Sequence, residues 1–154
     1  MFREMRRKDK ELSAEETRRV FENGLHGMLA TAGDGEYPYA VPLNYVYCDG
    51  SIFIHSAREG RKVDEIRRHP KVSFCVVEMA RLLPETFDTD YRSAIAFGEA
   101  DELLGADKEK ALSRFVAKYS ADYQAKGVEY IKGKMDSVSV FRIRVEHMTG
   151  KHQE

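Results

Sequence analysis

The stretch HGMLATAGDGEYPYAVPLNYVYCDGSIFIHSA, residues 26–57, decides the fold of this 154-residue chain. Apolar side chains recur in it at every second position, as in the series Val41, Leu43, Tyr45 and Tyr47. This is the spacing of a β-strand with one face in a core, because successive side chains of a strand point to opposite sides of the sheet. The stretch therefore predicts strands rather than helices.

Two dipeptides divide this stretch into separate strands. Asp34-Gly35 and Asp49-Gly50 supply, at little cost, the positive φ angles that tight hairpin turns require. We therefore predict antiparallel strands over residues 26–32, 38–47 and 51–56, joined as a meander.

The alternating pattern returns further along the chain. It predicts three more strands, at 72–76, 93–104 and 138–145, the last from the sequence VSVFRIRV. Six antiparallel strands indicate a mainly β fold with inserted helices, in the form of a small six-stranded antiparallel barrel. A doubly wound sheet is excluded because hairpin turns leave no room for helical crossovers.

Three inserted helices are predicted from their end signals. The first begins after Ser13, whose hydroxyl forms a capping box with Glu16, and ends at Gly24. The second runs between Gly60 and His69 and is stopped by a proline. The third is expected to be capped by Asp107, and its apolar side chains recur at helical spacing: Leu112, Phe115, Val116 and Tyr119.

Composition limits the classes of protein that this chain can represent. Its length suggests a single domain, 1–154, in which residues 1–12 form a charged N-terminal arm. The 25 Lys and Arg against 26 Asp and Glu give a formal net charge of −1, which argues against nucleic-acid binding. No apolar run approaches the roughly 20 residues of a membrane span, and no secretory signal opens the sequence, so we expect a cytoplasmic protein without a membrane partner.

The sequence also lacks the residue spacings of the common catalytic and metal-binding motifs. The phosphate-binding, dinucleotide, zinc-protease and hydrolase-elbow patterns are all missing. The two cysteines, Cys48 and Cys75, do not form a Cys-x-x-Cys pair, and the five histidines do not pair at helical ligand spacing. We therefore expect no metal site.

The strongest local feature is residues 55–62, HSAREGRK, at a junction between a strand and a helix. Ser56 supplies a hydroxyl, Gly60 lets a ligand approach the backbone, and Arg61 and Lys62 bring charge to the positive end of the helix. This combination suits a phosphate. The same cations could equally form a solvated face balanced by neighbouring acidic residues, and the residues alone leave both interpretations open.

A proline interrupts the predicted strand at residues 39–45, YAVPLNY. Pro42 removes one ladder donor, so it requires an edge, a bulge or a place where a ligand replaces a neighbouring strand. Ala40 is small enough to leave space for a flat ring. An edge strand with a bulge explains the pattern as well as a ligand site does.

Taken in order, several segments of this chain resemble one flavin-binding family. They are Leu29–Thr31, Asp34-Gly35, Pro38–Tyr45, Asp49-Gly50, Phe53–Ala57, Gly60–Lys62, Tyr91–Ser93, Phe97–Ala100 and Thr149–Lys151. The series is similar to the pyridoxamine 5′-phosphate oxidase-related FMN-binding split barrels, in the branch that contains the nitroimidazole-resistance proteins. The resemblance extends over residues 3–151.

This resemblance implies a six-stranded split β-barrel, a homodimer and FMN bound at the subunit interface. The residues that it implies along the isoalloxazine ring are Ala40, Val41, Pro42, Leu43 and Asn44. Along the ribityl chain it implies His55, Ser56 and Ala57. Arg61 and Lys62 would hold the phosphate, and Ser93 would make a further contact. Contacts from Tyr91, Arg92 and Lys151 are also implied.

The function implied is an FMN-dependent oxidoreductase that reduces a small planar acceptor such as a nitroaromatic, with His55 as the catalytic proton donor. His55 could instead only orient the cofactor. Two other functions stay open: a flavin-binding or carrier module without turnover, and a haem-binding split barrel with His55 or His147 as axial ligand. Vitamin B6 oxidation is not expected, since the chain has no tryptophan and lacks the C-terminal substrate-phosphate signature of the oxidases.

Overall fold

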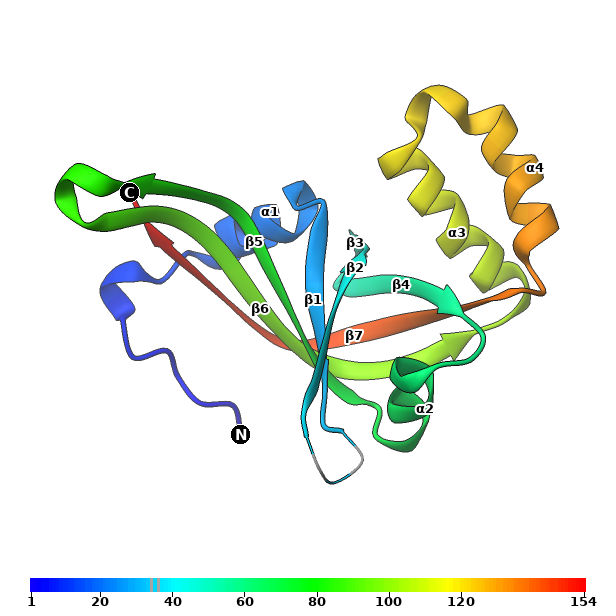
Figure 1. The fold of residues 1–154 in the computed structure, drawn as a ribbon, viewed down its shortest axis with the longest axis horizontal. Helices are drawn as coiled ribbons and strands as arrows, with labels where there is room; N and C mark the ends of the chain where they lie inside the picture. The colour runs from blue at the N-terminus through cyan, green and yellow to red at the C-terminus, as the bar shows by residue number, and fades with distance from the viewer. Residues whose placement is uncertain (34, 36) are drawn as a thin grey trace.

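The structure is a computed structural model that describes residues 1–33, 35 and 37–154. Seven strands in this part of the chain form one antiparallel sheet in the order β2-β1-β5-β6-β7-β4-β3, with four α-helices packed around it (Figure 1). The strands are β1 (His26–Thr31), β2 (Tyr39–Asn44), β3 (Val46–Cys48), β4 (Ser51–Ala57), β5 (Lys71–Leu83), β6 (Asp88–Leu103) and β7 (Val138–Gln153). The helices are α1 (Ala14–Asn23), α2 (Arg61–Arg68), α3 (Gly105–Tyr119) and α4 (Gln124–Lys134). The mainly β, antiparallel fold predicted from the sequence is confirmed.

The sheet is curled because β2 and β3 lie at its two edges and yet follow each other in the chain. Only Tyr45 separates them. A single residue spans less than about 4 Å, so the two edges must come close together. Tyr45 is fully buried at this junction, and its hydroxyl donates a hydrogen bond to the carbonyl of Phe21 at 2.6 Å.

The predicted meander is therefore wrong in one respect. Residues 38–47 form two strands rather than one: β2 pairs with β1, and β3 pairs with β4 on the far side of the sheet. The turn at Asp49-Gly50 is confirmed, with φ angles of 48° and 72° between the paired residues Cys48 and Ser51. Asp34, in the other predicted turn, lies outside the described residues.

The helices follow their sequence signals with two exceptions. The capping box of Ser13 and Glu16 starts α1, and α2 occupies the segment that follows Gly60. Asp107 does not cap α3, which already starts after Leu104, so that Asp107 lies in the first turn. The sequence analysis did not anticipate α4.

Two clusters of buried side chains hold the fold together. The larger fills the curled sheet and includes Phe21, Leu29 and Phe74. The smaller lies between the outer side of β4 and the α3–α4 hairpin, where Phe53 and Phe115 are buried. The hairpin therefore packs on the outside of the barrel, at one end of the molecule (Figure 1). No helix in the described ranges is long and apolar enough to cross a bilayer.

The charged N-terminal arm lies against the sheet. A short 3-10 helix occupies Lys8–Lys10, Glu11 forms an isolated bridge with Lys151, and Leu12 is buried. The ring of Phe2 stacks on His147 with 4.7 Å between the ring centroids.

Candidate functional site

Strand β2 presents alternate side chains to the surface. Ala40, Pro42 and Asn44 are exposed, whereas Val41 and Leu43 pack against the large core cluster. Because β2 is the first strand in the sheet order, Pro42 needs no ladder partner on its outer side, and its register with β1 is unbroken. Of the alternatives that the sequence left open for this proline, the edge position is confirmed and the bulge is not present.

The end of β4 directs His55 away from the barrel interior. His55 pairs with Val140 of β7, and its imidazole meets the ring of Phe115 edge-on, with 4.6 Å between centroids. Burial, and to a lesser extent the positive charge of Lys62, lowers the pKa of His55 below its usual value. His55 is therefore neutral at neutral pH. Ser56, on the other side of the strand, donates a hydrogen bond to the carbonyl of Ala57 at 2.7 Å.

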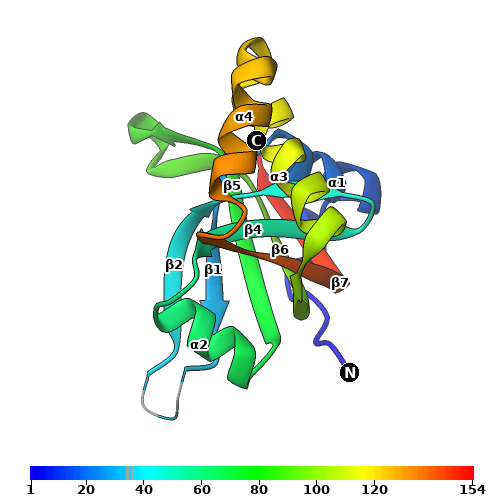
Figure 2. The ribbon, with the colours of Figure 1, turned by 90° about the vertical axis from the view of Figure 1, so that its right-hand side faces the viewer.

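The start of α2 holds Arg61 in a network of contacts. Its Nε donates a hydrogen bond to Oε1 of Glu65 at 2.6 Å, and its guanidinium lies 4.6 Å from the ring centroid of Tyr39 on β2. Glu65 is buried and also accepts a hydrogen bond from Thr31, and these two partners keep the pKa of its carboxyl low. The contact with Tyr39 joins the start of α2 to β2, beside which α2 lies in Figure 2.

Gly60 makes the turn from β4 into α2. Its φ angle of 133° belongs to a region that other residues rarely adopt. The amide of Val63 already donates a hydrogen bond to the carbonyl of Gly60 at 3.0 Å, and Arg61 and Lys62 precede Val63 in the first turn of the helix. The predicted phosphate-binding segment therefore has the geometry of a helix N-terminus with two adjacent cations.

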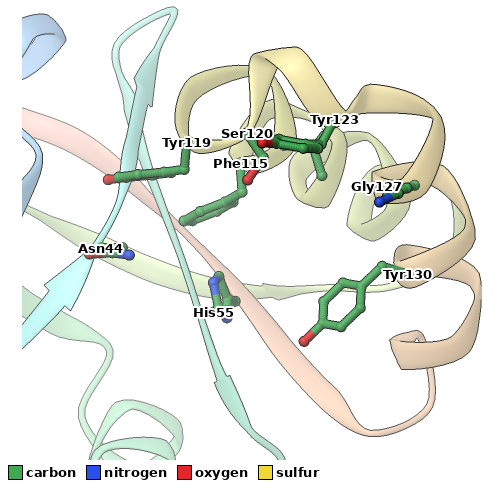
Figure 3. A pocket seen from close by; sticks show the side chains of 10 residues that line it. Asn44, His55, Phe115, Tyr119, Ser120, Tyr123, Gly127 and Tyr130 are labelled. Atoms are coloured by element: carbon green, nitrogen blue, oxygen red, sulfur yellow. The ribbon is translucent and has the colours of Figure 1, made fainter.

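A cleft opens between these strands and the α3–α4 hairpin (Figure 3). Its volume is about 410 Å³, and Asn44 and His55 form its sheet side. The opposite side consists of residues from the two helices and the segment between them: Phe115, Val116, Tyr119, Ser120, Tyr123, Lys126, Gly127 and Tyr130. Figure 3 shows His55 among Phe115, Tyr119 and Tyr130.

The sequence analysis missed this helical wall. It assigned Phe115 and Tyr119 to the apolar face of a helix and assigned nothing to residues 120–134. By their spacing, Leu112, Phe115, Tyr119 and Tyr123 all fall on one helical face, which is the ordinary pattern of a packed helix, so no signal in the sequence distinguished them as the wall of a cleft. The rings of Tyr123 and Tyr130 are in fact 62% and 65% exposed.

The structure does not bring Ser93 to the cleft within one chain. Ser93 pairs with Lys151, whereas His55 pairs with Val140, eleven residues earlier on β7. At about 3.3 Å per residue, the two positions are separated by roughly 35 Å of strand. Tyr91, Arg92 and Lys151 lie at the same distant end: Arg92 is paired with Glu154 at 2.6 Å, and the Nζ atom of Lys151 lies 5.3 Å from the Tyr91 ring centroid.

The outer face of the sheet carries a row of exposed and half-buried side chains that begins on β2. In register across five strands lie Pro42, Met28, Cys75, Ile95 and Thr149. Met28 and Ile95 are each 41% exposed. A mostly apolar row of this kind on a sheet face is typical of an interaction surface.

Comparison with known proteins assigns this arrangement to a family. The fold is a curled antiparallel sheet with a helix N-terminus beside its edge strand. Residues 13–152 of the chain match the model of the family described as pyridoxamine 5′-phosphate oxidase. The chain belongs to this family, as the resemblance in the sequence analysis predicted. No curated protein matches it in sequence.

Solved structures share the fold. A candidate 5-nitroimidazole antibiotic resistance protein from Bacteroides thetaiotaomicron is 20% identical with a TM-score of 0.73, covering 94% of this chain and 90% of its own. An FAD-binding protein from Mesorhizobium loti is 26% identical with a TM-score of 0.68, covering 94% and 98%. An FAD- and haem-binding protein from Mycobacterium smegmatis is 13% identical with a TM-score of 0.71, covering 94% and 74%.

Proposed function

We propose that this chain binds FMN between two copies of itself and acts as an oxidoreductase on small planar acceptors such as nitroaromatics. The observation that carries the proposal is that Arg61 contacts Tyr39 at the start of β2, and that the outward side chains of this strand lead from there to Asn44 and the cleft at His55. A cationic helix end, a flat strand face and a cleft follow one another in the order phosphate, flavin ring, acceptor.

The phosphate end fits the group. Lys62 carries a charge beside the first turn of α2, and the guanidinium of Arg61, which bonds Glu65 through Nε and the carbonyl of Tyr37 through Nη2, adds a second positive charge there. A phosphate at this helix end would accept hydrogen bonds from backbone amides and from both side chains. Bound FMN would supply the electron transfer, and the protein would supply its position.

The strand face fits a flat ring. Ala40, Pro42 and Asn44 all point outward from β2, and the first two have no polar side-chain atom, so a ring can lie against them without covering an unpaired side-chain donor. Val41 and Leu43 face the core and would contribute only backbone atoms. His55, neutral at neutral pH, would donate a hydrogen bond from one ring nitrogen and accept a proton on the other.

A second copy completes the proposed site. A ring on an edge strand is open on its outer side, and a second protein surface is needed to bury both of its faces. The exposed row that begins at Pro42 offers an apolar surface for this contact. Ser93 and Lys151, which one chain holds far from its own His55, would then reach the flavin of the partner copy.

Flavin titration tests the proposal. The purified protein should bind FMN, seen as a shifted flavin absorbance and quenched flavin fluorescence, and should bind riboflavin much more weakly. Replacing both Arg61 and Lys62 with Ala should weaken FMN binding by about a hundredfold and leave riboflavin binding unchanged, since each charge-assisted phosphate contact contributes about 1.5–3 kcal/mol. Equal affinity of the wild-type protein for the two flavins would contradict the phosphate assignment.

Reduction followed by reoxidation separates the proposed oxidoreductase from a flavin carrier. Photoreduced, FMN-loaded protein should be reoxidised by a nitroaromatic faster than free reduced FMN at the same concentration. A carrier would show no such acceleration. Since one similar structure is named for both FAD and haem, a titration with hemin is the control, and a sharp Soret band with exclusion of FMN would favour the haem alternative.

A further inference from the structure

The helical wall of the cleft contains more exposed aromatic surface than packing requires. Phe115 is buried against the sheet, but the rings of Tyr123 and Tyr130 remain more than half exposed. Both line the cleft, Tyr130 near His55 and Tyr123 at the far end of the hairpin beside Ser120 (Figure 3). Aromatic faces left open toward a cleft can stack on a flat ligand, and such ring pairs stabilise binding beyond the effect of their buried area.

The cleft continues inward as a smaller cavity. This inner cavity has a volume of about 100 Å³ and shares His55, Phe115 and Tyr130 with the outer cleft. Its remaining lining is mostly aliphatic and includes Leu112 and Ile131. The two spaces together form a site with an apolar inner end and an open, more polar mouth, which is the usual layout of a small-molecule site.

The charged residues that line both spaces are all basic. Lys126 lines the outer cleft and Lys134 the inner cavity, whereas no carboxylate of a described residue lines either space. The Nζ atoms of Lys126 and Lys134 lie 5.9 and 5.7 Å from the ring centroids of Tyr123 and Tyr130, so each exposed ring has an ammonium group beside it. An anionic group at the mouth would find a cation next to each aromatic face.

The width of the cleft is set by a close contact between the two helices. A Cβ atom on Gly127 would lie 2.4 Å from one methyl group of Val116 and 2.9 Å from the other. Only glycine allows this approach without displacing α4 from α3. Because both residues line the cleft, any larger side chain at position 127 would change its shape.

We propose that the cleft between His55 and the α3–α4 hairpin binds a planar aromatic anion, such as an aromatic carboxylate, with its ring between Phe115 and Tyr130 and its anionic group beside Lys126. The inference rests on the proposed function, because it names the acceptor class of that same site. It adds the sign of the ligand's charge and the residues that select it, neither of which follows from the fold.

Calorimetry with two matched probes tests the inference. We would titrate 4-nitrobenzoate and 4-nitrobenzylamine, which carry opposite charges on the same ring, into FMN-loaded protein and into flavin-free protein. The carboxylate should bind at least about tenfold more tightly than the amine to both forms. Lys126→Glu should abolish this preference, and Tyr130→Leu should weaken binding of the carboxylate about threefold to tenfold, as lost stacking predicts.

Lys132→Glu is the matched control. Lys132 lies on the same helix and is exposed, and the substitution changes the net charge of the protein by the same amount, but Lys132 does not line the cleft. The control should leave the preference intact. If it lowers carboxylate affinity as much as Lys126→Glu does, the preference is a property of the whole protein's charge and the inference is wrong. Equal affinity for the two probes, or no binding of either, also overturns it.

The same titrations separate this inference from the proposed function. Flavin content is read from absorbance and carboxylate binding from heat. A protein that binds 4-nitrobenzoate with the predicted preference but takes up no FMN would support the cleft assignment and contradict the flavin proposal. A protein that binds FMN but binds 4-nitrobenzoate only when FMN is absent would show that both occupy one space, and the cleft assignment would fail.

Discussion

The buried carboxylate of Glu65 fixes the guanidinium of Arg61 at a distance of 2.6 Å between Oε1 and Nε. The Glu65 side chain is only 3% exposed, whereas that of Arg61 is 49% exposed. The anchored end of the pair is therefore inside the protein, and the guanidinium extends outward, where Nη2 donates a hydrogen bond to the carbonyl of Tyr37 at 3.3 Å. This relationship orients one of the two cations proposed to hold a flavin phosphate.

Glu65→Gln should weaken FMN binding by about tenfold, because an arginine that is no longer oriented must lose side-chain entropy on binding. Riboflavin binding should not change. Fluorescence titration of both flavins measures the effect, with Asp64→Asn as the control: it removes the same charge from an exposed position of the same helix. Tighter FMN binding by Glu65→Gln would show instead that Glu65 acts by neutralising the cation.

Stability should depend on pH through Lys118. Burial lowers the pKa of Lys118 to about 8, although its ammonium donates hydrogen bonds to the carbonyls of Gly24 and Tyr45. Between about pH 8 and 10.5 the unfolded chain holds a proton that the folded chain has lost, so the free energy of unfolding rises with pH over this interval. The contribution should be about 1–3 kcal/mol.

Urea unfolding at a series of pH values in this range measures the free energy of unfolding of the wild-type protein and of Lys118→Met. The wild-type value minus the value of this variant should grow with pH. Lys110→Met, at an exposed position of the same helix, is the matched control. A constant difference for Lys118→Met would mean that its two carbonyl partners restore the ordinary pKa.

Gly127→Ala should destabilise the protein by about 1–3 kcal/mol, because the added methyl group must displace Val116 or move α4. The matched control is Gly133→Ala on the same helix, where a Cβ atom would meet nothing within 4 Å. That substitution should stabilise the protein by up to about 1 kcal/mol through helix propensity. Chemical unfolding of both variants gives the comparison, and equal effects would show that the helix contact is not tight.

Ile95→Glu should convert the proposed dimer into a monomer and lower its flavin content, because it places a charge in the middle of the exposed row on the outer sheet face. Light scattering coupled to size exclusion measures the mass. Leu104→Glu is the control, since Leu104 is 73% exposed but lies at the start of α3, away from this row. If Ile95→Glu remains dimeric, the subunits associate through another face.

Local patterns predicted the elements that depend on neighbouring residues. The capping box at Ser13, the hairpin at Asp49-Gly50 and the edge position of Pro42 were all predicted, since each follows from the conformational limits of one or two residues. The capping role assigned to Asp107 was wrong because the chain turns into the helix earlier, at Leu104.

The candidate site was only partly visible in the sequence. Residues 55–62 and β2 were identified because they carry local signals of charge, glycine and proline. Tyr123 and Tyr130 were not, because an exposed ring in a short helix resembles ordinary packing until the partner surface is known. The pairing that separates Ser93 from His55 within one chain depends on strand register over the full length of β7.

The sequence by itself determined most of the strand and helix segments, the family and the cluster of cations at the start of α2, because turn chemistry, side-chain period and charge are local properties of the chain. Only the tertiary structure decided that the strand through residues 38–47 is divided at Tyr45 between the two edges of the sheet. It also decided that two helices stand over His55 to form a cleft lined by aromatic and basic residues. These features result from contacts between segments distant in sequence, whose geometry is fixed by the packing of the whole core.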